Sequence, residues 1–113
     1  MEISKDTVDG KTVVSLSGRI DSTAAVEFED QLVDIINKGT NVMVVDFLNV
    51  QFISSAGLRV LLLAAKKVKP YGGKIHLCNM SKDVREVFDI SGFSSIFNIH
   101  NAVSDAITAI KAG

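Results

Sequence analysis

The sequence predicts an α/β fold, in which a mixed β-sheet of about four to five strands carries about four packed α-helices. Strand-like and helix-like segments alternate along most of the chain, which favours parallel strands joined by helical crossovers. An Asp-Gly pair between two β-prone runs indicates one antiparallel hairpin in the same sheet. A valine-rich run at residues 41–47 has the composition of a central strand that is buried on both faces.

The N-terminal part of the chain predicts the hairpin and a first helix. Asp9 and Gly10 form the turn between two strands within residues 2–18. Residues 22–39 then show helical spacing, with Gly39 as a C-terminal cap. The apolar side chains expected to share one broad face of this helix are Val26, Phe28, Leu32, Ile35 and Ile36.

The middle of the chain predicts a long helix and another strand. Residues 57–74 contain the helix, which Pro70 and the Gly72–Gly73 turn bring to an end. Residues 74–79 have the composition of a strand and include Cys78, the only cysteine. A single cysteine excludes an internal disulfide, and its apolar neighbours predict a buried structural thiol.

The C-terminal part predicts two more helices with a short strand between them. Residues 81–92 form a helix that Ser81 caps, and Gly92 lies just after its end. Residues 95–99 are a candidate short strand, and residues 101–113 form a terminal helix. The apolar face of the terminal helix carries Val103, Ile107 and Ile110.

The composition predicts one globular domain that spans residues 1–113. The chain is 47% hydrophobic and 22% charged, which favours a packed core over disorder. The net charge is −1 with both signs interspersed, so no basic patch indicates direct nucleic-acid binding. No apolar run approaches the roughly 20 residues that span a bilayer, and the start lacks a signal-peptide pattern. We therefore expect a cytoplasmic protein without a membrane segment.

Two adjacent serines, Ser54 and Ser55, stand between two apolar runs and lead into the long helix. Functional sites in open sheets gather beyond the carboxyl ends of the strands. Asp21 follows the second predicted strand, and Asp46 lies near the end of the buried valine-rich strand. We therefore expect these four residues to meet at one edge of the sheet.

The sequence favours Ser55 as the N-cap of the long helix, with Ala56 and Gly57 in the first two helical positions. At that place a hydroxyl lies near unpaired N–H groups and the positive end of the helix dipole, where a phosphate is also stabilised. Two interpretations follow from the residues alone. Ser55 only caps the helix, or it also accepts a phosphate.

Catalytic chemistry at these residues lacks its usual motifs. A serine nucleophile would need a glycine two positions earlier, where Ile53 stands, and a base from His76 or His100, which are distant in sequence. The chain has no glycine-rich nucleotide loop, and Asp21 with Asp46 fit turn or cap roles better than a metal site. We therefore predict a protein with no enzymatic activity, metal, cofactor or small-molecule substrate.

The long helix carries apolar residues on more than one side. One face at helical spacing comprises Leu58, Leu61, Leu62, Ala65 and Val68. Val60, Leu63 and Ala64 fall on the other side, where polar residues would be expected. This additional apolar surface is either a docking patch for a partner or is covered by a neighbouring element of the fold.

Four segments, in order along nearly the whole chain, carry a family resemblance. They are residues 16–21 (LSGRID), residues 44–58 (VVDFLNVQFISSAGL), the glycine pair at 72–73 and residues 84–93 (VREVFDISGF). With these segments the chain resembles the STAS domain family, and more narrowly its free-standing bacterial anti-sigma factor antagonists. The resemblance implies a single STAS-like domain.

The resemblance also implies partner switching in transcription regulation. The unphosphorylated protein would bind an anti-sigma factor with serine kinase activity and so release a sigma factor. That kinase would switch the protein off by phosphorylating one serine, and a serine phosphatase would restore it. An alternative role within the family is a STAS scaffold or sensor subunit, never phosphorylated, in a larger signalling or lipid-transport assembly.

The acceptor serine of the family corresponds to Ser55, and Ser54 is the alternative acceptor. Ser54 takes the place of an aspartate in the family motif, and Ala56 takes the place of a second hydroxyl residue. Asp21 matches the family's aspartate after the second strand. The residues expected to border the acceptor or bind the partner are Asp21, Asp46, Ser54, Ala56, Gly57, Arg59, Val60 and Leu63.

Overall fold

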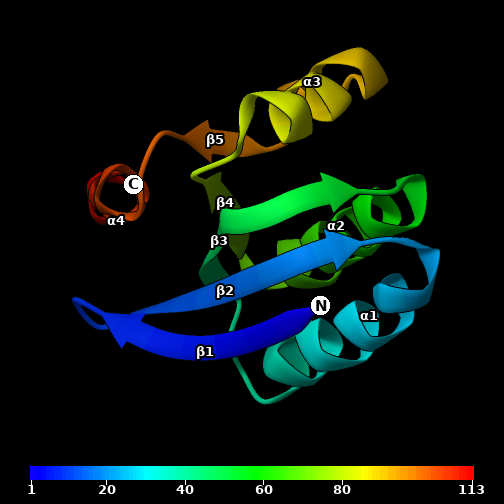
Figure 1. Ribbon diagram of the computed structural model, residues 1–113. Coiled ribbons are helices and arrows are strands. Elements are labelled where there is room, and N and C mark those ends of the chain that lie inside the picture. The colour runs from blue at the N-terminus through cyan, green and yellow to red at the C-terminus, as the bar shows by residue number, and fades with distance from the viewer.

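The computed structural model describes residues 1–113 and contains one five-stranded sheet with the strand order β1-β2-β3-β4-β5 (Figure 1). β1 runs antiparallel to β2, and every other neighbouring pair is parallel. The predicted mixed sheet is therefore confirmed. The strand bounds are β1 Glu2–Val8, β2 Lys11–Ile20, β3 Val42–Ile53, β4 Lys74–Cys78 and β5 Asn98–His100.

Three helices join strands in the predicted alternating order, and a fourth follows β5 at the end of the chain. Their bounds are α1 Ser22–Asn37, α2 Ser55–Val68, α3 Lys82–Ser91 and α4 Val103–Ala112, with the short 3-10 helices η1 Lys69–Tyr71 and η2 Phe93–Ser95. Ser81 caps α3, and Gly92 follows its end in the left-handed conformation, as predicted. None of the four helices combines the length and apolar character that a membrane crossing requires.

The sheet has a large core on one face and a small one on the other. α1, α2 and α3 pack on the face that carries Met43 and Val45 of β3, in a cluster of 21 buried residues. α4 packs on the face that carries Val44, in a cluster of 5 buried residues. Successive residues of a strand point to opposite faces, so β3 is buried on both sides, as its composition predicted.

The β1–β2 hairpin turns at Asp9 and Gly10, as predicted. Both residues have positive φ angles, 51° and 74°, which the two-residue turn requires and which Asp and Gly adopt more readily than most residues. Val8 pairs with Lys11 directly across the turn. The turn residues therefore set the register of the one antiparallel pair in the sheet.

Two strand boundaries differ from the sequence prediction. β3 continues beyond residue 47 to Ile53, and two shifts in its register against β2 show that the pairing is bulged. β5 lies at Asn98–His100 rather than at residues 95–99, because the preceding residues form η2. His100 therefore belongs to a strand and not to a loop.

One residue of the predicted apolar face of α1 lies outside the core. Val26 is 66% exposed, so the prediction that it belongs to the apolar face of the helix is wrong. The helix buries Ala25, Phe28 and Leu32, which follow one another at three and four positions and define the inward face. Val26 follows Ala25 directly in the chain, so it lies on a different side of the helix and points to solvent. The other predicted members of the face lie in or against the core.

Candidate functional site

The carboxyl ends of β2 and β3 meet at one edge of the sheet, where α1 and α2 begin (Figure 1). Ile20 pairs with Ile53 at the strand ends, and the N–H of Ser54 donates to the Ile20 carbonyl over 2.8 Å. Asp21 caps α1 by accepting a hydrogen bond from the N–H of Ala24 over 2.8 Å. The structure thus confirms that Asp21 and the serine pair lie at one edge.

The N-cap of α2 is Ser54, so the prediction that Ser55 caps the helix is wrong. Ser54 has extended backbone angles (φ −86°, ψ 168°), and its Oγ accepts a hydrogen bond from the N–H of Gly57 over 3.2 Å. The hydrogen bond to the end of β2 keeps Ser54 extended, so the helix begins at the next residue. Ser55 is that residue, and its exposed hydroxyl forms no hydrogen bond within the protein.

Gly57 allows α2 to begin directly against the strand ends. A Cβ atom at this position would lie 2.8 Å from Cγ1 of Ile53 and 2.9 Å from Cγ2 of Ile20. These distances are shorter than carbon atoms tolerate in a packed interior. Gly57 is itself buried. It therefore positions the serine pair against the sheet and offers no contact surface to a partner.

The accessible predicted residues of α2 form one strip along its outer side. Arg59 is exposed one turn beyond Ser55, and Leu63, one further turn on, is partly exposed. Ala56, at the start of the helix, is also partly exposed. We call this strip the acceptor face; it comprises Ser55, Ala56, Arg59 and Leu63.

Val60 and Ala64 do not contribute to the acceptor face, because the core covers them. Val60 is 4% exposed, and Ala64 is also buried. Both belong to the large core cluster, in which α2 packs beside α1. For these two residues, the interpretation that a neighbouring element of the fold covers them is confirmed. The expectation that Val60 contacts a partner is wrong.

Arg19 and Phe52 form a pair at the same edge that the sequence pattern did not reveal. They occupy paired positions on β2 and β3, and the Arg19 guanidinium lies 4.5 Å from the centre of the Phe52 ring. The ring attracts the cation and holds it near the strand ends. The pairing depends on the bulged register of the two strands, which no local pattern indicates.

Asp46 lies away from this edge, so the expectation that it meets the serine pair is wrong. It pairs with Ser15 of β2, and from Ser15 to Ile20 the strand rises about 16 Å at about 3.3 Å per residue. Its Oδ1 accepts hydrogen bonds from the N–H of Leu48 and the side-chain amide of Asn79, both over 3.0 Å. Asp46 therefore links β3 to the start of the loop that follows β4.

Cys78 lies beside Asp46 on the neighbouring strand and is buried, as predicted for a structural thiol. Burial, and secondarily the Asp46 carboxylate, raise the pKa of the Cys78 thiol to about 12. The thiolate is the reactive form of cysteine. The thiol is therefore protonated at neutral pH and is a poor nucleophile.

His76 and His100 form a pair on the face of the sheet that α4 covers. His76 Nδ1 lies 3.0 Å from His100 Nε2, and the rings are stacked with their centres 5.2 Å apart. His76 pairs in register with Val44, so it lies even further from the serine pair than Asp46 does. Neither histidine is placed to act as a base for Ser55.

Acidification below pH 6.5 is expected to lower the free energy of unfolding through His76. Burial, then His100 and Lys74, lower the pKa of His76 from its ordinary value of 6.5. Because the unfolded chain takes up the proton at higher pH than the folded protein, stability falls as the pH drops below about 6.5. Urea unfolding between pH 5 and 7.5 measures this loss.

The variant His76→Phe is the control for this prediction. It removes the titrating group and keeps an aromatic ring under α4, so its stability should depend less on pH between about 5 and 6.5. An equal pH dependence in both proteins would show that other groups, and not His76, cause the loss.

Comparison with known proteins gives one family over nearly the whole chain. The family model for the STAS domain matches residues 2–106. A Bordetella bronchiseptica protein named as a candidate anti-sigma factor antagonist, BtrV, is 40% identical over 98% of this chain and 96% of its own. The anti-sigma-B factor antagonist of Bacillus subtilis is 31% identical over 76% of this chain and 78% of its own.

A comparison with solved structures leads to the same family. The crystal structure of an anti-sigma factor antagonist from Mycobacterium paratuberculosis superimposes with a TM-score of 0.88 at 25% identity. The superposition covers 97% of this chain and 93% of that one. The predicted STAS-like fold is confirmed by this match.

Proposed function

Because the chain belongs to the STAS domain family, we propose that it is an anti-sigma factor antagonist that works by partner switching. In its unphosphorylated form it binds an anti-sigma factor in the cytoplasm and so releases the sigma factor. Its relatives that are named antagonists match it over most of their length, which supports this role. The anti-sigma factor is a serine kinase that phosphorylates the antagonist and ends the complex, and a serine phosphatase reverses this step.

The observation that carries the proposal is the separation of roles between the two serines. Ser54 uses its Oγ to cap α2, whereas the Ser55 hydroxyl is exposed and free at the start of the same helix. A phosphate on Ser55 would stand near the positive end of the helix dipole and one turn from Arg59. A phosphate on Ser54 would instead disrupt the cap.

The separated roles also account for the departure of this chain from the family motif. The family motif that this chain resembles commonly has an aspartate at the place of Ser54. Aspartate and serine are both good N-caps, because each places a side-chain oxygen where it accepts a backbone N–H. The change therefore retains the cap and removes one negative charge beside the acceptor.

The chain needs to supply only the hydroxyl for phosphoryl transfer. The Ser55 Oγ attacks the γ-phosphorus of ATP, the bond from that phosphorus to the bridging oxygen breaks, and ADP leaves. The hydroxyl proton passes to a base of the kinase, which also supplies the nucleotide and metal sites. The acceptor face is where we expect the kinase to dock, with Asp21 and Arg19 beside it at the same edge.

The variant Ser55→Ala should abolish phosphorylation, whereas the variants of the two capping serines should not. After incubation with ATP and the anti-sigma kinase of the same organism, the intact mass of the wild-type protein should rise by one phosphate. Peptide mapping should place that phosphate on Ser55. Ser54→Ala should still accept it, although loss of the cap should lower the free energy of unfolding by about 1 kcal/mol.

The matched control is Ser81→Ala, because Ser81 caps α3 by the same geometry, accepting from the N–H of Val84 over 3.1 Å. It should lose similar stability to Ser54→Ala and keep wild-type phosphorylation. A phosphate mapped to Ser54 would contradict the acceptor assignment. A stable complex with that kinase and no phosphate transfer would instead favour a constitutive scaffold or sensor subunit.

A further inference from the structure

A groove separates the C-terminal half of α2 from the segment that joins η2 to β5. β4 forms its floor, and its volume is about 450 Å³, within the roughly 300–1,000 Å³ of pockets that hold ligands. The apolar side chains that line it are Leu62, Ala65, Val68, Ile75, Ile96 and Phe97. Ile96 is 53% exposed, whereas Ile75 and Phe97 lie deep, at 4% and 7%.

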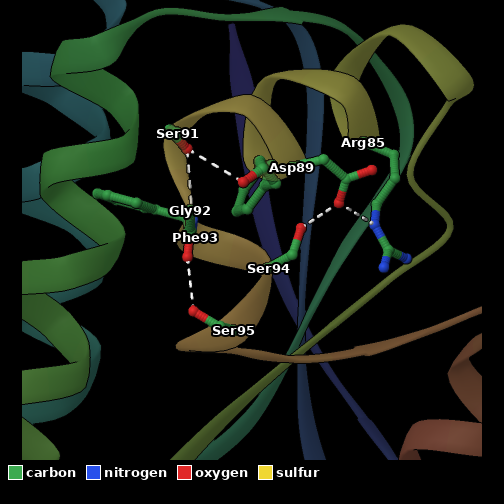
Figure 2. Close-up of polar contacts among 8 residues, drawn as sticks. Arg85, Asp89, Ser91, Gly92, Phe93, Ser94 and Ser95 are labelled. Atoms are coloured by element: carbon green, nitrogen blue, oxygen red, sulfur yellow. Dashed lines mark hydrogen bonds and ion pairs between the residues drawn. The ribbon is translucent and has the colours of Figure 1, made fainter.

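The wall that carries Ile96 is held in place by side-chain hydrogen bonds (Figure 2). Asp89 accepts hydrogen bonds from Arg85, over 3.1 Å, and from the hydroxyl of Ser94. The Ser95 hydroxyl donates to the Gly92 carbonyl over 2.8 Å. These contacts fix the turn after α3, so Ile96 stays exposed at the rim.

The aromatic core anchors the next residue of the same wall. The Phe97 ring packs edge-on against Phe88, with ring centres 6.3 Å apart, and lies 6.3 Å from the centre of Phe93. The groove is therefore preformed and does not depend on a flexible segment to close it. A preformed site loses less conformational entropy when it binds.

The rim of the groove is positively charged. Lys66, Lys69 and Lys74 line it, and no acidic residue does. None of the three lysines has a carboxylate within ion-pair distance. The sequence between Asp46 and Asp83 contains no acidic residue, although the whole chain carries a net charge of −1.

Two of these lysines, Lys66 and Lys69, stand on the α2 side of the groove, where that helix ends. Lys74 precedes Ile75 on β4, so its side chain points to the opposite face of the sheet, where it acts on His76. The charge of the groove therefore lies along its α2 wall, beside an apolar floor and an apolar second wall, which is the complement of an acidic chain with apolar side chains.

We propose that this groove binds an acidic peptide segment of a partner protein. An aliphatic or aromatic side chain of that segment would pack on Ile96 and Leu62, and its carboxylates would face Lys66 and Lys69. A bilayer would not reach the deep-lying side chains of Ile75 and Phe97, whereas a side chain that projects from a peptide does. Peptides are commonly recognised through such apolar anchors with flanking charges.

This surface is separate from the acceptor face. α2 rises about 20 Å from Ser55 to Val68 at about 1.5 Å per residue, and the groove lies along its C-terminal half. A phosphate on Ser55 would therefore leave the groove free. The proposal stands independently of the phosphorylation cycle.

A peptide titration followed by amide NMR tests the proposal. The probe is a short synthetic peptide in which Leu alternates with Glu. We expect chemical-shift changes at Leu62, Ile96 and Phe97 and none at Ser55. A peptide in which Lys replaces Glu should cause none of these changes. Absence of shifts in the groove at millimolar Leu-Glu peptide would overturn the proposal.

Two charge-matched variants separate the groove from general electrostatics. Lys66→Glu with Lys69→Glu should weaken binding of the Leu-Glu peptide about tenfold. Lys5→Glu with Lys82→Glu makes the same change in net charge at exposed positions outside the groove and should leave the affinity unchanged. Equal weakening in both variants would overturn the proposal.

Vesicles of phosphatidylglycerol provide the competing outcome. The protein should not bind them at physiological salt. If the vesicles bind, the groove variant abolishes that binding, and the peptide does not bind, the groove is a membrane-facing surface and the peptide proposal is wrong.

Discussion

Replacing Gly73 by alanine is expected to lower the free energy of unfolding by more than about 3 kcal/mol, or to prevent folding. A Cβ atom there would lie 2.1 Å from the carbonyl oxygen of Asn41 and 2.7 Å from Cβ of Val68. Backbone hydrogen bonds fix this region, because Gly73 donates to the Val68 carbonyl and Lys74 to the Asn41 carbonyl, both over 2.9 Å. The backbone cannot retreat without breaking them.

The neighbouring Gly72 provides the control for this prediction. It has a φ of +68°, and a Cβ there would meet nothing within 4 Å. Gly72→Ala should therefore lose only about 1 to 2 kcal/mol, from the left-handed backbone conformation. Urea unfolding followed by far-ultraviolet circular dichroism gives both values. Similar losses in the two variants would show that the close approach at Gly73 is relieved elsewhere.

Phosphorylation of Ser55 is expected to weaken binding to the anti-sigma factor several-hundred-fold, equivalent to about 3 to 4 kcal/mol. The acceptor face joins Ser55 to the partly exposed apolar side chains of Ala56 and Leu63. A phosphate adds a charge of about −1.5 to −2, which would have to lose its hydration when a partner covers this face. The start of α2 accommodates that charge, so the fold itself should not change.

Titration calorimetry of the unphosphorylated and phosphorylated proteins with the anti-sigma factor measures this loss. Ser55→Ala should bind with the wild-type affinity, and Ser55→Asp should lose part of it because it carries less charge than a phosphate. Amide NMR spectra should show changes confined to the edge where α1 and α2 begin. Equal affinity of the two phosphorylation states would contradict the proposed switch.

Features that depend on local sequence were predictable. The hairpin turn at Asp9 and Gly10 follows from the backbone angles that such a turn needs. The limits of α3 follow from the cap at Ser81 and the left-handed residue Gly92. The buried character of β3 follows from its run of valines. Each of these depends on residues that are close in sequence.

Features that depend on contacts between segments distant in sequence were not predictable. The bulged register of β2 and β3 carries β3 on to Ile53, which moves Asp46 away from the edge and makes Ser54 the cap. The burial of Val60 requires the packing of α1 beside α2. The contact of His76 with His100 requires the pairing of β4 with β5. Asp21 was placed correctly because adjacent parallel strands end at a common edge.

The cap at Ser54 has a consequence for the time course of the proposed switch. Because Ser54 holds the start of α2, the group on Ser55 can be added or removed without remaking the helix. Such a cycle would have no slow refolding step of α2, so the state of the protein would not depend on its earlier state. The active fraction would therefore follow the ratio of the kinase and phosphatase rates at each moment, in the same way on rising and falling signals.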